Sequence, residues 1–471
     1  MALDKRHVTA DNENDSHYHN TRLVPGSYCA PTGRTLAATS RFHVEGLYRM
    51  RAFWTVIHRW AGLTIALFLI VAGLTGAVTS WDHELDEWLN ADIMETPGRG
   101  ALQPPFVLAQ KVAAADPRVE VNYMTLGLEE GHAAAFMVRP LTDPATNKPF
   151  VLDYNTVYID PVTAQITGTR DSTAISLSRR SLMPFLRHLH YSLHVPAFWG
   201  TDRWGYWLMG TVALIWLLDS MVAFYLTTPR RLRPRAHDEA PRHRDAASWW
   251  QRWKPSWVVR WAAGGYKLNF DLHRAGGLWV WGVIIVVAFT SFSLNLYREV
   301  FYPVMSLVST TTPGPYETQT PAPYGSYITP VIGFEQAAAI AKEQAQQRGI
   351  TAPIGGIYYG GNYSFYNVSF FDPADEFGAA GMGLSNLYVD GMDGSIIGQH
   401  KPWEGTAADV FVQLQFPLHS GRILGLPGRI LMSFMGVMVA MLSVTGVVIW
   451  ERKRRARRLQ AHKLKTVGTQ S

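Results

Sequence analysis

The 471-residue sequence has a single cysteine, Cys29, which lies in a polar amino-terminal stretch. One cysteine excludes an intramolecular disulfide, a cysteine-ligated iron–sulfur cluster and covalent attachment of haem through a Cys-x-x-Cys-His motif. The sequence also lacks a Gly-x-Gly-x-x-Gly segment and a Gly-Lys-Ser/Thr loop. We therefore expect no site for NAD(P)H or flavin, and any haem must be held without a covalent bond.

Charged residues are scarce, at 17% of the sequence, and four long apolar runs contain almost none of them. These runs are residues 61–80, 207–226, 275–296 and 430–450, and each meets the requirement of about 20 residues for crossing a bilayer core. Residues 1–50 lack the apolar core of a cleaved signal peptide, so we expect the first run to remain as an anchor. Four spans would place both termini on one side of the membrane.

Basic residues crowd three stretches, namely residues 1–60, residues 228–267 and the tail after Trp450. The positive-inside rule predicts that these stretches are cytoplasmic, which puts residues 82–186 and 298–416 on the opposite face. Each basic stretch adjoins an apolar run, so the net charge of +6 favours the lipid bilayer over nucleic acid as a partner.

The sequence indicates a duplicated chain. The motif His-Arg-x-x-Gly-Leu occurs at residues 58–63 and again at 273–278, each time at the start of an apolar run. Two further pairs of segments correspond, residues 158–160 with 388–390 and residues 189–190 with 418–419. Each half therefore reads as span, outer domain, span, which indicates one duplication and not a repeat array.

Each outer segment combines a helical pattern with alternating strands. In the second, residues 334–348 favour a helix, and residues 362–371 and 386–389 favour strands. We predict an α-helical membrane protein of four spans with two α+β domains on one side. Five tryptophans between residues 249 and 261 indicate a further helix along the cytoplasmic membrane surface.

The predicted order of segments is a polar cytoplasmic tail (1–50), the first transmembrane helix (51–81), the first outer domain (82–186), a short outer helix with the second transmembrane helix (187–227), a basic Trp-rich loop (228–267), the third transmembrane helix (268–297), the second outer domain (298–416), a short outer helix with the fourth transmembrane helix (417–451), and a basic tail (452–471).

His58 and His273 are candidate ligands of one haem iron. An imidazole in a membrane helix is costly without a partner, and both histidines stand at the cytoplasmic edge of a span. The glycine four residues on leaves room on the same helix face for a flat group such as haem, for which neutral imidazole is a standard axial ligand. The alternative is an interfacial histidine that caps a helix. Arg59 and Arg274 are candidates for contacts with haem propionates or with lipid phosphates.

A second bis-histidine site is predicted on the outer side, from His419 with His190 or His194. The last two stand four residues apart, which would put them on one helix face, and the duplication favours His190. His194 is an alternative ligand or a residue near the substrate. His83, just past the first span, is a weaker candidate whose alternative is a surface cap.

Two features of the spans themselves bear on function. Residues 196–200 and 425–428 are rich in glycine and proline, so we expect His190 and His419 to lie on short helices outside the spans. The spans carry no evident break at mid-membrane, which disfavours a carrier. Asp219, an acid inside the second span, can carry protons or touch a quinol, and the alternative is a hydrogen bond to a neighbouring helix.

With these motifs the chain resembles the PepSY-associated transmembrane family, which includes bacterial inner-membrane proteins linked to iron uptake and ferrisiderophore reductases of the ferrioxamine type. The resemblance rests on the paired His-Arg-x-x-Gly-Leu, Leu-His and Tyr-x-Asp segments and on residues 445–450, and it covers roughly residues 50–455. Two segments depart from the family pattern, residues 162–164 in the first turn and residues 219–220 in the second span.

The resemblance implies periplasmic PepSY-like domains, two b-type haems and a reductase in the bacterial inner membrane. Such a reductase passes electrons to a periplasmic ferric siderophore and releases ferrous iron. Because no nucleotide site is expected, the electron donor would be a membrane quinol or a separate reductase. The alternative is a non-enzymatic, membrane-anchored PepSY protein that binds or regulates a periplasmic partner.

Overall fold

The computed structural model describes residues 33–229, 247–373 and 377–468. The polar tail up to residue 32 and the middle of the basic loop, 230–246, lie outside the described residues. The chain divides into two units, Met1–Arg51 and Ala52–Ser471. In the first unit the described residues belong to one helix. All the candidate ligands lie in the second unit, whose fold follows.

Three of the described helices are long and apolar enough to cross a bilayer by themselves. They are α1 (Gly33–Thr79), α5 (Trp204–Thr227) and α14 (Leu426–Gly468). Only 28%, 33% and 22% of their most apolar windows are buried, so most of this apolar surface is left for lipid to cover. Runs of leucine, isoleucine, valine and alanine without proline in their interiors explain why these segments form helices.

The third apolar run is not one straight helix. It forms α7 (Gly265–Trp279) and α8 (Trp281–Asn295), which are bent by 72° relative to each other. The expectation of unbroken spans is therefore wrong here. Between the helices, Val280 leaves helical geometry, with φ −109° and ψ 7°. The indole N–H groups on either side are bound to different elements, Trp279 to the carbonyl of Trp257 and Trp281 to that of Ser220.

Short helices precede the second and fourth spans, as predicted. Helix α4 (Leu182–Ser192) carries His190, and α13 (Gln415–Ser420) carries His419. Both end in the left-handed conformation, α4 at Leu193 with φ 55° and α13 at Gly421 with φ 75°. The short helix predicted in the Trp-rich loop is α6 (Trp249–Trp253), which runs on into η1 (Lys254–Trp257).

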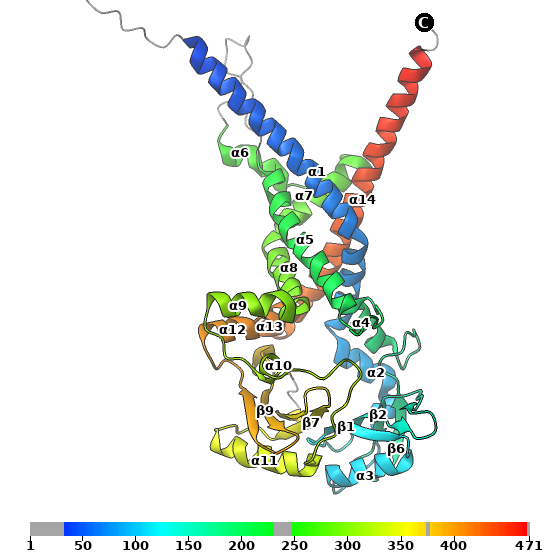
Figure 1. The fold of residues 1–471 in the computed structure, drawn as a ribbon. Helices are drawn as coiled ribbons and strands as arrows, with labels where there is room; N and C mark the ends of the chain where they lie inside the picture. The colour runs from blue at the N-terminus through cyan, green and yellow to red at the C-terminus, as the bar shows by residue number, and fades with distance from the viewer. Residues whose placement is uncertain (1–32, 230–246, 374–376, 469–471) are drawn as a thin grey trace, which may run out of the picture. The chain divides into compact units, whose positions relative to one another are not determined.

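Strands from the two outer segments form one eight-stranded antiparallel sheet, in the order β10-β9-β8-β7-β1-β2-β5-β6 (Figure 1). The two sets of four strands meet where β1 pairs with β7, with Tyr123 opposite Tyr358 and Thr125 opposite Gly356. The strands are β1 (Val119–Thr125), β2 (Ala134–Pro140), β5 (Thr156–Ile159), β6 (Ile166–Arg170), β7 (Ile354–Gly360), β8 (Phe365–Phe370), β9 (Ser385–Asp390) and β10 (Ile396–His400). A separate hairpin joins β3 (Thr142–Asp143) to β4 (Lys148–Pro149).

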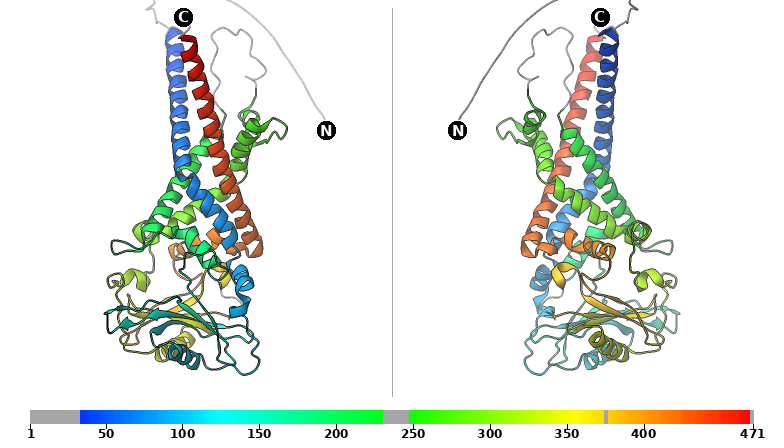
Figure 2. Two further views of the ribbon diagram at one scale, coloured as in Figure 1. Left: turned by 90° about the vertical axis from the view of Figure 1, so that its right-hand side faces the viewer. Right: turned by 90° about the vertical axis from the view of Figure 1, so that its left-hand side faces the viewer.

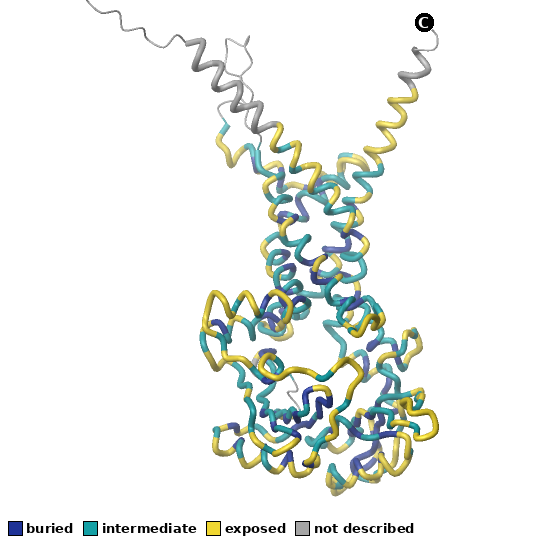
Figure 3. Tube along the Cα trace, in the orientation of Figure 1, coloured by how far each residue is buried: buried dark blue, intermediate teal, exposed yellow. Residues whose placement is uncertain are grey.

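The main soluble core lies between this sheet and two helices, α3 (Pro105–Ala115) and α11 (Phe334–Gln347), on one of its faces (Figures 1 and 2). Strand β9 illustrates this arrangement, because Leu387 and Val389 are fully buried while Tyr388 between them is not. This alternation is the period of a strand with one covered face. Figure 3 shows buried positions in this layer and along the facing sides of the spans.

The other face of the sheet is turned toward the spans, with several small helices between (Figures 1 and 2). These connecting helices are α2 (Asp82–Met94), η2 (Tyr297–Phe301), α9 (Tyr302–Val308), α10 (Pro315–Thr318), η4 (Ala379–Gly381), α12 (Ala407–Gln413) and η5 (Arg422–Leu424).

Candidate functional site

Two histidines from different halves of the chain face each other among the spans. The ring centroids of His58 on α1 and His273 on α7 are 6.2 Å apart, with the planes inclined by 45°. The Nδ1 atom of His58 lies 3.0 and 2.9 Å from the two carboxylate oxygens of Asp219 on α5. The Nδ1 atom of His273 lies 3.0 Å from the carbonyl of Leu442 and 3.1 Å from the hydroxyl of Thr445, both on α14. We call His58 and His273 the inner pair.

A second pair has nearly the same geometry. The ring centroids of His190 on α4 and His419 on α13 are 6.0 Å apart, with the planes inclined by 48°. The Nδ1 atom of His190 contacts the carbonyl of Ala72 at 2.9 Å and the hydroxyl of Thr75 at 3.2 Å. The Nδ1 atom of His419 contacts the hydroxyl of Thr290 at 3.2 Å. We call His190 and His419 the outer pair.

Burial favours the neutral form of both histidines of the outer pair. It lowers the pKa of His190, and it lowers the pKa of His419 to about 3, with the neighbouring His190 as a further cause. A neutral imidazole has a lone pair on one nitrogen, which is the form that binds a metal.

The hydrogen bonds fix which nitrogen carries that lone pair. Thr75, Thr290 and Thr445 each donate their single hydroxyl hydrogen to the carbonyl four residues earlier, at 2.7, 2.9 and 2.8 Å. The carbonyl oxygens of Ala72 and Leu442 can only accept, so Nδ1 of His190 and Nδ1 of His273 carry the hydrogen. Metal-binding histidines characteristically donate their other N–H to a carbonyl or carboxylate in this way. The Nε2 atom is thus left to bind a ligand.

Glycines give the imidazoles their room. A Cβ atom at Gly76 would lie 2.8 Å from Cε1 of His190, and one at Gly446 would lie 3.1 Å from Cε1 of His273. At Gly62 and Gly277, four residues beyond His58 and His273, the nearest atoms would lie 3.9 and 3.8 Å away. Gly76 and Gly446 therefore allow an imidazole ring to approach the helix closely, whereas Gly62 and Gly277 have no atom in close contact.

Both pairs fit a haem iron by donor type and by spacing. A nitrogen–metal bond of about 2 Å places the centre of an imidazole about 3.1 Å from the metal, so two rings on opposite sides of one iron have centroids about 6.2 Å apart. The observed 6.2 and 6.0 Å agree with this. Within the described residues no group of three or more His, Cys, Asp or Glu side chains could hold a bare metal ion. A haem would bring the other nitrogen ligands of its iron with it, so two imidazoles would be enough to hold it.

His194 does not share a helix face with His190, so the premise of that prediction is wrong. Helix α4 ends at Ser192, and both Leu193 and His194 adopt positive φ, at 55° and 53°. The ring of His194 stacks on Phe185 at 4.8 Å, and its Nε2 bonds the carbonyl of Phe185 at 2.8 Å. The structure therefore brings His190, and not His194, to His419.

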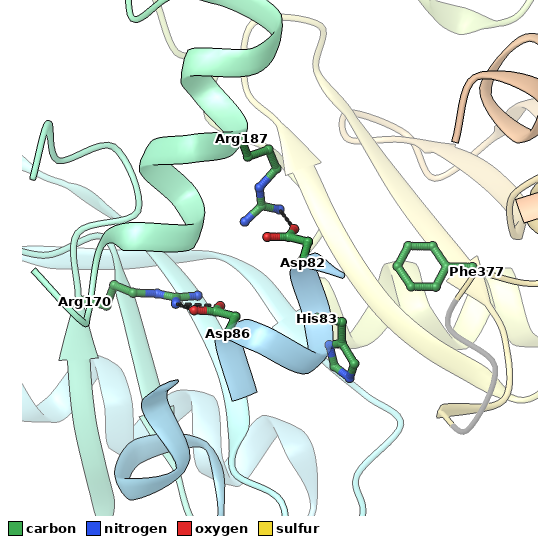
Figure 4. Close-up of a pocket in the computed structure, with 6 residues that line it drawn as sticks. All are labelled: Asp82, His83, Asp86, Arg170, Arg187 and Phe377. Carbon is green, nitrogen blue, oxygen red and sulfur yellow. Dashed lines mark hydrogen bonds and ion pairs between the residues drawn. The ribbon is translucent and has the colours of Figure 1, made fainter. Parts of the chain in front are cut away.

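His83 also lies apart from both pairs. It is on α2, 3.9 Å from Glu87, and it lines a cavity of about 370 Å³ with Asp82, Asp86, Arg170, Arg187 and Phe377. Figure 4 shows two ion pairs at this cavity, Arg170 with Asp86 and Arg187 with Asp82. Arg187 lies on α4, three residues before His190. A second cavity, of about 300 Å³, shares Arg170 and Arg187 with the first and reaches farther along α4.

The two candidate arginines differ. The buried Nε of each has no hydrogen-bond partner among the described residues. The guanidinium of Arg59 lies 5.3 Å from the ring of Trp60. The guanidinium of Arg274 already donates to the carbonyl of Pro255 at 2.8 Å and to Asp271 at 3.1 Å. Arg59 is therefore the better placed of the two for an added anionic group.

The anchors of the histidines were missed as a set by the sequence reasoning, although a signal was present. Near the end of each span a small polar or acidic residue precedes a glycine or serine, as in residues 75–76, 219–220, 290–291 and 445–446. Of these residues, only Asp219 is identified as a candidate from the sequence. Its hydrogen bond to His58 on α1 agrees with the alternative given for it, a hydrogen bond to a neighbouring helix.

Apolar spans, two facing pairs of histidines and an antiparallel sheet define a multi-pass helical membrane protein. The chain belongs to the family described as the PepSY-associated TM region, whose model matches residues 55–453. The match includes all four paired histidines and Asp219. No curated protein matches the chain.

Proposed function

We propose that this protein is a haem-containing reductase of the bacterial inner membrane that passes electrons to a periplasmic ferric siderophore and releases ferrous iron. The observation that carries the proposal is the geometry of the two histidine pairs. In each, two imidazoles with hydrogen-bonded Nδ1 atoms face each other at the separation expected for two ligands of one iron.

Each pair would hold one b-type haem. His58 and His273 would bind the first, with Arg59 available to a propionate, and His190 and His419 would bind the second. A bound haem supplies an iron that changes its charge by one electron. The protein supplies the rest, because the threonines and Asp219 hold the imidazole rings and the surrounding helices keep water from them.

The distance between the pairs suits transfer across a membrane. His58 and Thr75, whose hydroxyl contacts His190, are both on α1 and are 17 residues apart. At about 1.5 Å per residue they are separated by about 26 Å along the helix, close to the thickness of a bilayer core, which is about 30 Å. The two pairs therefore lie near opposite ends of the span. The inner pair adjoins the basic segments that the positive-inside rule assigns to the cytoplasm.

The acceptor side is the side of the sheet. The two cavities that share Arg170 and Arg187 lie beside α4, the helix of His190, so a ferric siderophore bound there would be near the outer pair. The electron donor would be a membrane quinol or a separate reductase, since the sequence has no nucleotide-binding motif.

The test begins with the absorption spectrum of the purified full-length protein. We expect a haem band that responds to dithionite, two haems per chain, and reduction of a ferric siderophore followed with a ferrous chelator. His273→Ala should remove one haem and His419→Ala the other, because each takes away one ligand. His194→Ala, on the same segment as His190, is the matched control and should keep both. A purified protein without haem would refute the proposal.

A second candidate is a non-enzymatic protein whose sheet binds a periplasmic partner. The observation in its favour is that β6 and β10 form two edges of the eight-stranded sheet, where an added strand can pair. A haem-free protein that binds such a partner would support this function instead.

A further inference from the structure

The four histidine anchors are not equivalent. Three of the Nδ1 atoms, those of His190, His273 and His419, contact uncharged threonine hydroxyls. His190 and His273 also contact a backbone carbonyl through Nδ1, and His419 has a backbone hydrogen bond to Val287. The Nδ1 atom of His58 contacts the carboxylate of Asp219, with both oxygens within 3.0 Å. Within the described residues, the inner pair therefore has an acidic anchor and the outer pair has none.

The burial of Asp219 strengthens the effect of its carboxylate on the inner pair. Its side chain is 9% exposed and lies inside the membrane-spanning helix α5. Among the residues that the structure describes, His58 is the only basic side chain that pairs with it. Nearby, Gly62 leaves a clear approach, because a Cβ there would still be 3.9 Å from the carboxylate. A charge so poorly covered by water acts strongly on its neighbours.

We propose that Asp219 is a positioning residue that holds His58 and lowers the reduction potential of the inner haem below that of the outer haem. This inference rests on the proposed function. A carboxylate that accepts the Nδ1 hydrogen makes the imidazole a stronger electron donor to the iron, and its negative charge favours the more positive, ferric state. Each haem takes up one electron, and no bond is made or broken. The difference makes electron flow from the inner to the outer pair favourable.

The substitution Asp219→Asn tests this. The amide oxygen can still accept from Nδ1, so the ring keeps its orientation while the charge is lost. In a potentiometric titration of the full-length protein, followed by haem absorbance, the wild type should show two one-electron steps. In the variant the midpoint potential of the lower step should rise by at least about 59 mV, which is a tenfold change in the equilibrium constant of a one-electron reduction. The midpoint potential of the upper step should not change.

Matched controls use the other anchors. Thr445→Val removes an uncharged contact of His273, whose Nδ1 still reaches the carbonyl of Leu442. The equilibrium constant of the lower reduction step should therefore change less than threefold. Thr290→Asp gives the outer pair an acidic anchor, so the potential of the upper step should fall. If Asp219→Asn loses the inner haem, the Thr290→Asp variant becomes the test. An unchanged potential of the upper step in that variant then overturns the inference.

The outcomes separate the two proposals. A wild type without haem refutes the reductase and the role of Asp219 together. A wild type with two haems but one common potential, or an Asp219→Asn variant with both haems and both potentials unchanged, refutes only the role of Asp219. A lower step in the wild type whose potential changes with pH, in a way that Asp219→Asn abolishes, would make Asp219 a proton carrier and also overturn the inference.

Discussion

Replacing Gly76 with alanine should selectively weaken the outer site. The added Cβ would lie 2.8 Å from Cε1 and 3.3 Å from Nδ1 of His190, closer than carbon atoms can approach without displacement. The ring cannot easily retreat, because its Nδ1 is held by Ala72 and Thr75. Forcing an extra methyl group into a packed site costs about 1–3 kcal/mol, which corresponds to a roughly 5- to 150-fold loss of haem affinity if the ring moves to relieve it.

Gly282→Ala is the control for this prediction. Gly282 is also a helical glycine, on α8, so both substitutions gain helix propensity, up to about 1 kcal/mol. At Gly282, however, the new Cβ would have no atom within 4 Å. The gain in helix propensity is therefore shared by the two variants, and only Gly76→Ala adds a clash with His190.

The assay is the haem-to-protein ratio after purification and after titration with haem. We expect two haems in the wild type and in Gly282→Ala, and about one tightly held haem in Gly76→Ala. The remaining haem should be the one that His273→Ala removes, so the double variant should be haem-free. Equal haem content and affinity in both alanine variants would show that His190 does not ligate through the position seen here.

Two further predictions concern the sheet and its cavities. Arg170→Met should lower the free energy of unfolding by about 3–5 kcal/mol, because it strands the buried carboxylate of Asp86, whereas Arg180→Met at an exposed ion pair should change it by less than about 1 kcal/mol. Thermal unfolding in detergent compares them, and equal melting temperatures would contradict the reasoning. Burial lowers the pKa of His400 in the folded state, so its unfolded form binds more protons below its ordinary pKa of about 6.5 and stability should fall as the pH drops below that value. His400→Gln should reduce this fall between pH 7.5 and 5.5, and an unchanged pH dependence would contradict it.

The sequence was a good guide where local pattern decides structure. Apolar runs of sufficient length located the spans, and glycine and proline at residues 196–200 and 425–428 located the breaks that leave His190 and His419 on short helices. The repeated motif also picked out the histidines that face each other. These features are determined by residues that are close together in the sequence, so the local pattern is sufficient to predict them.

Tertiary contacts decided the rest. The pairing of Tyr123 with Tyr358 joins strands more than 200 residues apart, and nothing in either strand indicates its partner. His194 leaves the helix face because two successive residues without glycine take the left-handed conformation, which is uncommon and has no sequence mark here. The bend at Val280 has no proline beside it, and the indole N–H groups of Trp279 and Trp281 bind carbonyls of other elements, contacts that the local sequence does not display.

The junction of β1 with β7 has a consequence for how the chain is made. Strand β1 ends at Thr125 and β7 at Gly360, so 235 residues are synthesised between the two. At about 5–20 residues per second, β1 waits about 12 to 47 s for its partner strand. During that time it is an open strand edge, a template for pairing with other chains. A nascent first half therefore needs protection at β1, an edge that the finished sheet covers with β7.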